Sequence, residues 1–350
     1  MESSQLYAAM SPVFWICRVS GLFPFSNNFT ISIFWVLFPP SLFGLVTANA
    51  YFFYFYAEEF DGFAGEMYFG LCFSLYISVA ALVVFSFTMG GLYKKIMATV
   101  LDVEIFLTQL DVQFKYCTTT IILDVALRAA TIFATSIANY NEYSDDALQL
   151  YLRAIGFYLT HWCVNCVEMQ IVALCSYLSC LIKSATSSLP SPDFEGFLEA
   201  STGFVEISEM IHVLFSKPSF VIFGNIFICT TLDLYFLIVV LPEMESRSIK
   251  WFSLGRCFAR CYQLWRLVST VSSMSDEAKR LDSKLYTIAI EDPTNQISKK
   301  KKLILYFSMN QRMEITACGF FPINYALIHS VVAAVTNYLV ILVQFGNTPS

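Results

Sequence analysis

Ionisable side chains recur at helical spacing inside long apolar stretches of this sequence. Asp124 and Arg128 lie four residues apart, so they share one face of a helix and can form an ion pair. An unpaired charge at the centre of a bilayer costs about 2.5–3.5 kcal/mol, and pairing would reduce that cost. Two roles stay open for these residues, a structural ion pair or a contact to a bound ligand.

A second set of polar residues lies on one face of the next apolar stretch. His161, Asn165 and Glu168 are spaced by four and three residues, and Thr160 and Trp162 flank the first of them. A ligand pocket needs this mixture of an aromatic wall and a few directed polar groups. Hydrogen bonding between helices is an equally good explanation of the same pattern.

Later apolar stretches contribute further polar groups of the same kind. Asp233 and Gln263 each stand among aromatic neighbours inside a hydrophobic stretch. Aromatic faces together with acids and amides would suit a sugar-like ligand, and the aromatic content of 17% would also suit bulkier apolar compounds. The candidate ligand-binding residues are Thr160, His161, Trp162, Asp233 and Gln263.

Catalysis and metal binding are poorly supported. The three histidines fall in different segments, and no HExxH, GxSxG or glycine-rich phosphate loop is present. Cys163 and Cys166 are spaced like zinc ligands, but they lie within an apolar stretch and no second pair follows at zinc spacing. We therefore expect no enzyme activity, no catalytic residue, no metal site and no cofactor.

The last hydrophobic stretch, Phe320–Phe345, is long enough to cross the hydrocarbon core as a helix and contains no charged residue. Asn337, Ile341, Gln344 and Phe345 recur on one face of that helix. Alternation of amides with bulky apolar groups is typical of a pore that both admits water and closes. The alternative is that the amides bind this helix to a neighbouring helix.

The elements that must position these residues are membrane-spanning helices. Hydrophobic residues make up 57% and charged residues 14% of the chain, and the mean hydropathy is +0.60. Globular chains carry about 25% charged residues, so we predict a polytopic, all-α membrane protein. Seven transmembrane helices are expected, at about 30–57, 67–90, 117–140, 151–182, 219–241, 249–272 and 320–345.

The distribution of basic residues predicts how these helices are oriented. Most of the 21 Lys and Arg residues fall in the N-terminal segment and in alternate loops, including the run 299–302 before the last stretch. The positive-inside rule therefore predicts a cytoplasmic N-terminus and an extracellular C-terminus, opposite to a G-protein-coupled receptor. The net charge of −6 argues against nucleic-acid binding.

The C-terminal stretch resembles the signature that closes insect gustatory receptors, Thr-Tyr-x5-Gln-Phe. Tyr338 is followed by five apolar residues and then by Gln344-Phe345, although Asn337 stands where the family usually has Thr. The approach to this motif is also similar, with Ala317-Cys318-Gly319 and Phe321-Pro322-Ile323-Asn324-Tyr325. The strong match covers only 310–345, and the rest agrees in hydropathy pattern.

This resemblance implies a taste receptor in the plasma membrane that works as a tastant-gated, non-selective cation channel. Its partners would be a sugar or bitter compound, membrane lipid, permeating cations, and further subunits in a homotetramer or a heteromer. Residues 1–272 would form a ligand-binding bundle, and residues 273–350 a cytoplasmic anchor segment and the pore-lining seventh helix. The alternatives are a G-protein-coupled receptor and a secondary transporter, although no inverted repeat is apparent.

Overall fold

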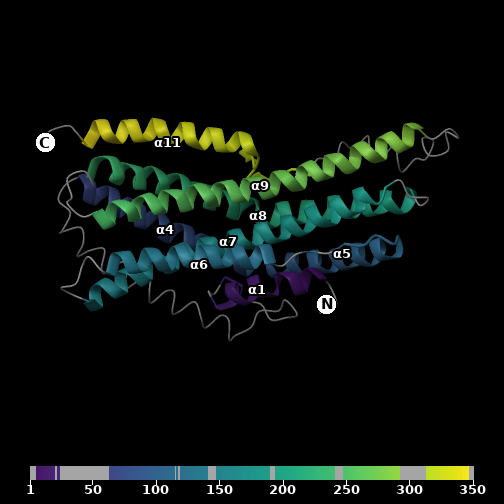
Figure 1. The fold of residues 1–350 in the computed structure, drawn as a ribbon, viewed down its shortest axis with the longest axis horizontal. Coiled ribbons are helices and arrows are strands. Elements are labelled where there is room, and N and C mark those ends of the chain that lie inside the picture. The colour runs from purple at the N-terminus through teal and green to yellow at the C-terminus, as the bar shows by residue number, and fades with distance from the viewer. Residues whose placement is uncertain are drawn as a thin grey trace.

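The computed structural model describes residues 5–19, 22–23, 63–114, 116, 119–140, 147–189, 194–240, 247–291 and 313–346, and these residues are mostly helical (Figure 1). Its elements are α1 (Gln5–Val19), α4 (Phe63–Thr88), α5 (Gly90–Gln109), α6 (Thr119–Tyr140), α7 (Ala147–Ser187), α8 (Phe194–Tyr235), a π-helical turn (Phe236–Val240), α9 (Arg247–Glu291), β1 (Thr316–Ala317), β2 (Phe321–Pro322) and α11 (Tyr325–Gly346).

Five of the expected hydrophobic stretches correspond to helices of the structure. The stretches at 67–90, 117–140, 151–182, 219–241 and 249–272 correspond to α4, α6, α7, α8 and α9, and the stretch at 30–57 lies outside the described residues. Length and composition allow three described segments to cross a membrane, namely His161–Ser187, Phe194–Val239 and Tyr325–Phe345. A fourth candidate is the pair α4–α5, which is bent by 58° between Thr88 and Gly90. Seven spans and their orientation stay a prediction.

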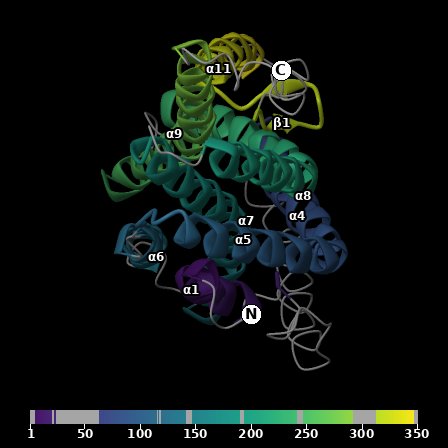
Figure 2. The same ribbon diagram turned by 90° about the vertical axis from the view of Figure 1, so that its right-hand side faces the viewer.

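The long helices continue well beyond the apolar stretches. In Figure 1, α11 lies beside only one half of α8 and α9, and the other half of the molecule consists of α5 with the far ends of α7, α8 and α9. Figure 2 shows α11 on the outside of α8 and α9, with α1 on the opposite side of the molecule. Within the bundle, α7 makes its most extensive contact with α9.

The far half of the molecule has its own polar and aromatic packing. The buried Glu104 of α5 accepts backbone hydrogen bonds from Gln5 (3.1 Å) and Leu6 (3.3 Å), so its carboxylate caps the positive end of α1. The hydroxyl of Tyr177 donates to the same carboxylate at 2.6 Å. These contacts tie α1, α5 and α7 together.

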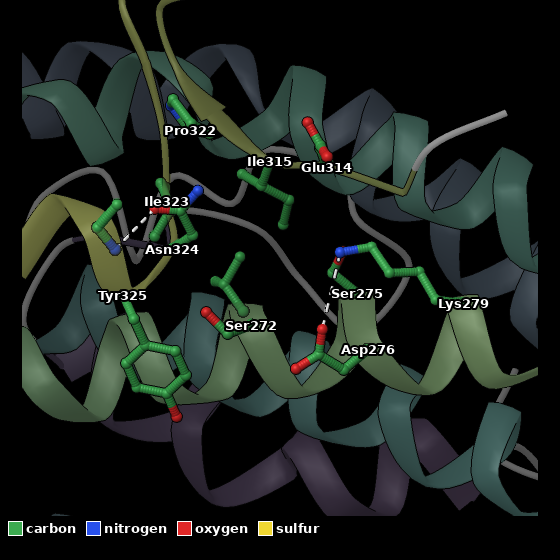
Figure 3. A pocket seen from close by; sticks show the side chains of 12 residues that line it. Ser272, Ser275, Asp276, Lys279, Glu314, Ile315, Pro322, Ile323, Asn324 and Tyr325 are labelled. Atoms are coloured by element: carbon green, nitrogen blue, oxygen red, sulfur yellow. Dashed lines mark hydrogen bonds and ion pairs between the residues drawn. The ribbon is translucent and has the colours of Figure 1, made fainter. Parts of the chain in front are cut away.

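The last stretch is helical only from Tyr325, so the expected start at Phe320 is wrong. β1 and β2 form a hairpin through Cys318 and Gly319, which both have positive φ (51° and 74°), as in type I′ turns. Asn324 then ends the extended segment, because its Oδ1 accepts the backbone N–H of Ala326 at 3.0 Å as a helix N-cap (Figure 3).

The hairpin is attached to α8 rather than to its own helix. The backbone N–H of Thr316 donates to His212 Nδ1 at 3.2 Å, and that of Cys318 donates to Ser216 Oγ at 2.9 Å. Both acceptors lie just before Pro218, which α8 contains without ending there. The hairpin therefore places the start of α11 against the middle of α8.

Candidate functional site

A buried ionic network joins α6 to α7. Both guanidinium nitrogens Nη1 and Nη2 of Arg128 lie 2.9 Å from the two carboxylate oxygens of Glu168, a bidentate pair. Glu168 is 0% exposed and Arg128 is 3% exposed. Such a pair compensates two desolvated charges only because its geometry is close and its remaining donors are also satisfied.

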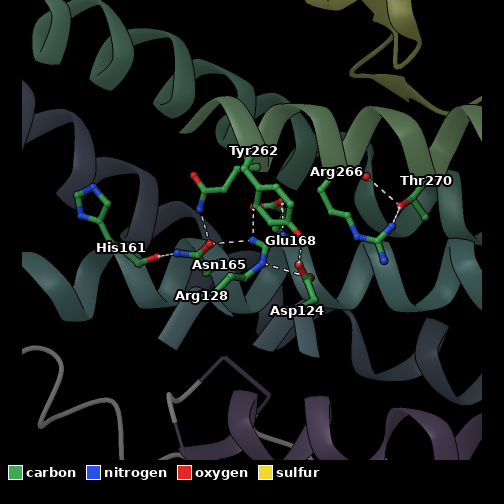
Figure 4. A network of polar contacts seen from close by, with 9 residues as sticks. Asp124, Arg128, His161, Asn165, Glu168, Tyr262, Arg266 and Thr270 are labelled. Carbon is green, nitrogen blue, oxygen red and sulfur yellow. Dashed lines mark hydrogen bonds and ion pairs between the residues drawn. The ribbon is translucent and has the colours of Figure 1, made fainter. Parts of the chain in front are cut away.

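The pair expected from sequence spacing is part of this network. Arg128 Nε lies 3.2 Å from Asp124 Oδ2 along α6. The other oxygen of Asp124 accepts a hydrogen bond from the Tyr262 hydroxyl of α9 at 2.9 Å. Figure 4 shows these side chains converging from three helices on one buried position.

Asn165 connects the ionic group to the rest of α7 and to α9. Its Oδ1 accepts from Arg128 Nη1 at 2.8 Å and also from the Gln263 amide, and its Nδ2 donates to the carbonyl oxygen of His161 at 2.9 Å. The imidazole of His161 in turn contacts the guanidinium of Arg260. The network therefore runs without a break from α6 through α7 to α9.

Arg260 extends the network towards α4 and α8. Its Nη1 lies 3.4 Å from Asn225 Oδ1, and Asn225 Nδ2 lies 3.4 Å from Ser78 Oγ. One helical turn away, Arg256 Nη2 lies 2.8 Å from the buried Asp233 Oδ1. Five helices thus share polar contacts inside one apolar bundle.

The structure brings some of the predicted ligand-binding residues together and separates others. His161 and Gln263 belong to the network of Asp124 and Arg128, and Asp233 lies on α8 in its own pair with Arg256. Trp162 is half-buried against the hydrophobic core.

The side chain of Thr160 lies outside the described part of the chain. Hydrogen bonding between helices, the alternative explanation, describes the present contacts of His161, Asp233 and Gln263.

Glu168 is the centre of the network, although it is not among the candidate ligand-binding residues. Its spacing places it on one face with His161 and Asn165, but its pairing with Arg128 crosses from one helix to another. The available signal was charge balance, because a second buried acid beside Asp124 and Arg128 demands a partner. Spacing along the chain does not say which helix supplies that partner.

The polar residues of α11 are exposed, unlike those of the buried network. One side packs on the bundle: Leu327 and Val335 are buried, Leu342 lies against Leu75, Cys229 and Leu232, and the ring of Tyr338 meets that of Phe227 edge-on at 5.5 Å. The other side carries Asn337, Ile341 and Gln344, and all three are exposed, Ile341 by 44%; Phe345, at the end of the helix in line with Leu327, is 66% exposed.

This exposed face extends along the whole of α11. His329 and Asn337 lie on it, at spacings of four residues from the small Ala333 between them, and Gln344 continues the line two turns further. Within a span of mean hydropathy 2.1, a row of polar side chains is therefore exposed on the surface of the described part of the chain.

Comparison with known proteins gives three findings. The family model of the 7tm chemosensory receptors matches residues 204–348, which contain most of α8 and all of α9 and α11. A curated relative, the gustatory receptor for bitter taste 66a of Drosophila melanogaster, is 25% identical over 155 residues. That alignment covers 40% of this chain and 28% of the length of the Drosophila receptor.

Solved structures show the same fold over nearly the whole chain. The insect olfactory receptor OR5 from Machilis hrabei superposes with a TM-score of 0.73 at 11% identity, covering 97% of this chain and 98% of that chain. Its complex with eugenol gives a TM-score of 0.69 at 12% identity and the same coverage.

The motif at Tyr338, Gln344 and Phe345 lies inside the region that the family model matches. The helical bundle that buries the polar network has the same fold as the olfactory receptor. On these findings residues 204–348 are similar to the 7tm chemosensory receptors, and the chain shares the fold of an insect olfactory receptor.

Proposed function

We propose that this protein is a taste receptor of the plasma membrane that works as a tastant-gated, non-selective cation channel, with α11 lining a central pore between subunits. The observation that carries the proposal is the exposed polar face of α11. Amide side chains are costly in lipid, so a membrane-spanning helix keeps them against water or protein. Within the described chain, that face of α11 is not covered by another helix.

A pore explains the composition of this face. Asn337 and Gln344 would line the ion path, because their amides can replace part of the hydration of a cation. Ile341 and Phe345 would form the gate, because bulky apolar side chains exclude water from a narrow pore. One helix cannot enclose a pore, so several copies must meet around an axis. A homotetramer or a heteromer with related receptors would meet that requirement.

Ligand would bind in the bundle, away from the pore. Thr160, His161, Trp162, Asp233 and Gln263 are the proposed contacts, and a ligand would exchange the present interhelical contacts of His161, Asp233 and Gln263. A sugar or a bitter compound is the proposed tastant, and one relative is named for bitter taste. To shift the channel from 1:99 to 99:1 open, the ligand must bind the open state more tightly by about 5.5 kcal/mol.

This proposal assigns different functions to two parts of the chain. Residues 1–272 would form the ligand-binding bundle, and residues 273–350 the anchor segment and the pore helix, with the N-terminus inside and the C-terminus outside the cell. α9 runs unbroken through this boundary, from Arg247 to Glu291. It could therefore transmit movement between the two parts as a rigid element.

Substitution at the pore face tests the proposal directly. Gln344→Ala should change relative cation permeability or block in ligand-evoked currents, with normal amounts of receptor at the cell surface. The matched control is Val332→Ala, because Val332 is also exposed on α11 but lies on another side of the helix. Unchanged permeation in Gln344→Ala would remove this residue from the pore.

Two further measurements separate the rival functions. An epitope tag after Ser350 should be accessible on intact cells; labelling only after permeabilisation would favour a receptor coupled to a G protein. Trp162→Ala should weaken the response to ligand more than it changes single-channel conductance. Substrate uptake without a ligand-opened conductance would instead support a transporter.

A further inference from the structure

A cavity lies where α9 passes under the hairpin and the first turn of α11 (Figure 3). Its volume is about 270 Å³, which is slightly below the range of about 300–1,000 Å³ for sites that hold drug-sized ligands. One wall comes from α9, with Ser272, Ser275, Asp276 and Lys279, and the other from the segment 314–326. A compact molecule in this cavity would touch two elements that meet at the base of the proposed pore helix.

The charges in the cavity do not balance. Lys279 Nζ lies 3.7 Å from Asp276 Oδ1 along α9. The one ammonium group of the cavity lining therefore already has a counter-ion. Glu314 lies on the opposite wall and is exposed, and no Lys, Arg or His among the described residues pairs with it. Within the described part of the chain, the cavity therefore carries one carboxylate without a cationic partner.

A buried hydroxyl points to the same conclusion from the other wall. Ser272 is only 6% exposed, yet its Oγ has no hydrogen-bond partner among the described residues. Burying a hydroxyl without a partner is unfavourable, so such a group calls for an explanation. Because Ser272 lines the cavity, a bound molecule can supply the missing hydrogen bond.

Apolar groups make up much of the remaining surface. Val271, Ile315, Ile323 and Ala326 line the space between the two polar groups. A bare metal ion would not suit this lining, because Ca²⁺ takes six to eight oxygen ligands and Mg²⁺ six. An anion in the cavity would be repelled by the carboxylate of Glu314.

We propose that this cavity binds a small organic ammonium compound. Its ammonium group pairs with Glu314, its hydrocarbon part lies against Ile315 and Ile323, and a polar atom bonds to Ser272. The compound is either a free amine or the ethanolamine head group of a phospholipid. A phospholipid head group would lie close to the cavity, because the apolar span of α11 begins at Tyr325, which lines it. Head groups lie at the ends of such spans.

Binding by the purified full chain in detergent tests the site without any current, so its outcome is separate from that of the channel proposal. Isothermal titration calorimetry would compare 2-phenylethylamine with 2-phenylethanol, which has the same skeleton without the charge. We expect the amine to bind about fivefold more tightly, the effect of one partly exposed ion pair. Equal binding of the two compounds, or no binding of the amine, would overturn the proposal.

Substitutions of Glu314 test whether the preference for the amine arises at this cavity. Glu314→Gln should abolish the preference for the amine, and Glu314→Asp should retain part of it. Glu314 is exposed, so neither change should affect folding. The control is Glu209→Gln, an exposed acid of α8 that does not line the cavity, which should bind like the unmodified chain. An undiminished preference in Glu314→Gln would rule out this site.

Nanodiscs distinguish the two sources of the ammonium group. If ethanolamine head groups occupy the cavity, adding phosphatidylethanolamine to phosphatidylcholine nanodiscs should weaken amine binding to the unmodified chain. The weak binding of Glu314→Gln should then not change. Equal affinity in both membranes, together with a preference that depends on Glu314, would identify a free amine as the ligand.

Discussion

Polar side chains at the centre of the network are buried and paired in the interior of the bundle, but the polar side chains on the outer face of α11 are exposed. In the bundle, Arg128 and Glu168 are withdrawn from solvent and satisfied by neighbours in the same chain. On α11, Asn337 and Gln344 lie exposed in a span just as apolar as those of the bundle. The first arrangement is complete within one chain, whereas the second leaves both side chains accessible to water or to another molecule.

This difference separates residues that hold the fold from residues that are available for function. A polar group with all its partners in the chain contributes to the stability of one arrangement of helices, and its loss leaves a buried charge unpaired. A polar group that points away from the chain contributes little to folding. Substitutions in the two regions should therefore differ in what they damage, and in how much.

The largest effect is expected at the centre of the network. Arg128→Met leaves two buried carboxylates without their cation, which typically costs about 3–5 kcal/mol. We expect a large fall in surface expression and in the melting temperature of the purified receptor. Adding Glu168→Gln to this variant should recover part of the loss, because it removes one unpaired charge. A stable single variant would show that the network is not what holds α6 to α7.

Close helix packing gives the next largest effect. A Cβ atom at Gly203 of α8 would lie 2.7 Å from Val103 Cγ2 of α5, so Gly203→Ala should cost about 1–3 kcal/mol of folding free energy. Gly224→Ala in the same helix is the control, because a Cβ there meets nothing within 4 Å. That control should be neutral or stabilising by up to about 1 kcal/mol. Thermal unfolding of the two variants would measure the contrast.

An exposed ion pair should count for much less than the buried one. Lys95 Nζ of α5 lies 3.2 Å from Glu206 Oε1 of α8, but the two side chains are 61% and 51% exposed. After allowance for solvent screening, Lys95→Ala should cost only about 0–1 kcal/mol. The melting temperature should fall slightly at low salt and not at all at high salt. A loss comparable to that of Arg128→Met would contradict the contrast between buried and exposed charge.

The smallest effect on folding is expected on the face of α11. Asn337→Leu should change stability by less than about 0.5 kcal/mol, because the side chain is exposed. Ion permeation should nevertheless change, in line with a pore-lining position. Unfolding of the monomer in this variant would show that Asn337 serves the fold, and would remove the distinction between the two regions.

Local sequence patterns predicted much of the fold and part of the network. Runs of apolar residues located α4, α6, α7, α8 and α9, because only helices satisfy the backbone inside a membrane. Spacing of four residues placed Asp124 beside Arg128, because a helix brings such positions onto one face. Helix ends were less predictable. The apolar pattern of the last stretch does not show that Asn324 caps a helix that begins five residues late.

The sequence by itself determined the class of protein, the position of its apolar helices and the C-terminal motif that resembles insect gustatory receptors, since all three depend on composition and short spacing. Only the tertiary structure decided which helix supplies the partner of Arg128, which side of α11 stays uncovered, and that Ser272 and Glu314 line one cavity. These features depend on how helices far apart in the chain are rotated against one another. That rotation is determined by packing over the whole bundle, and no single stretch of residues contains it.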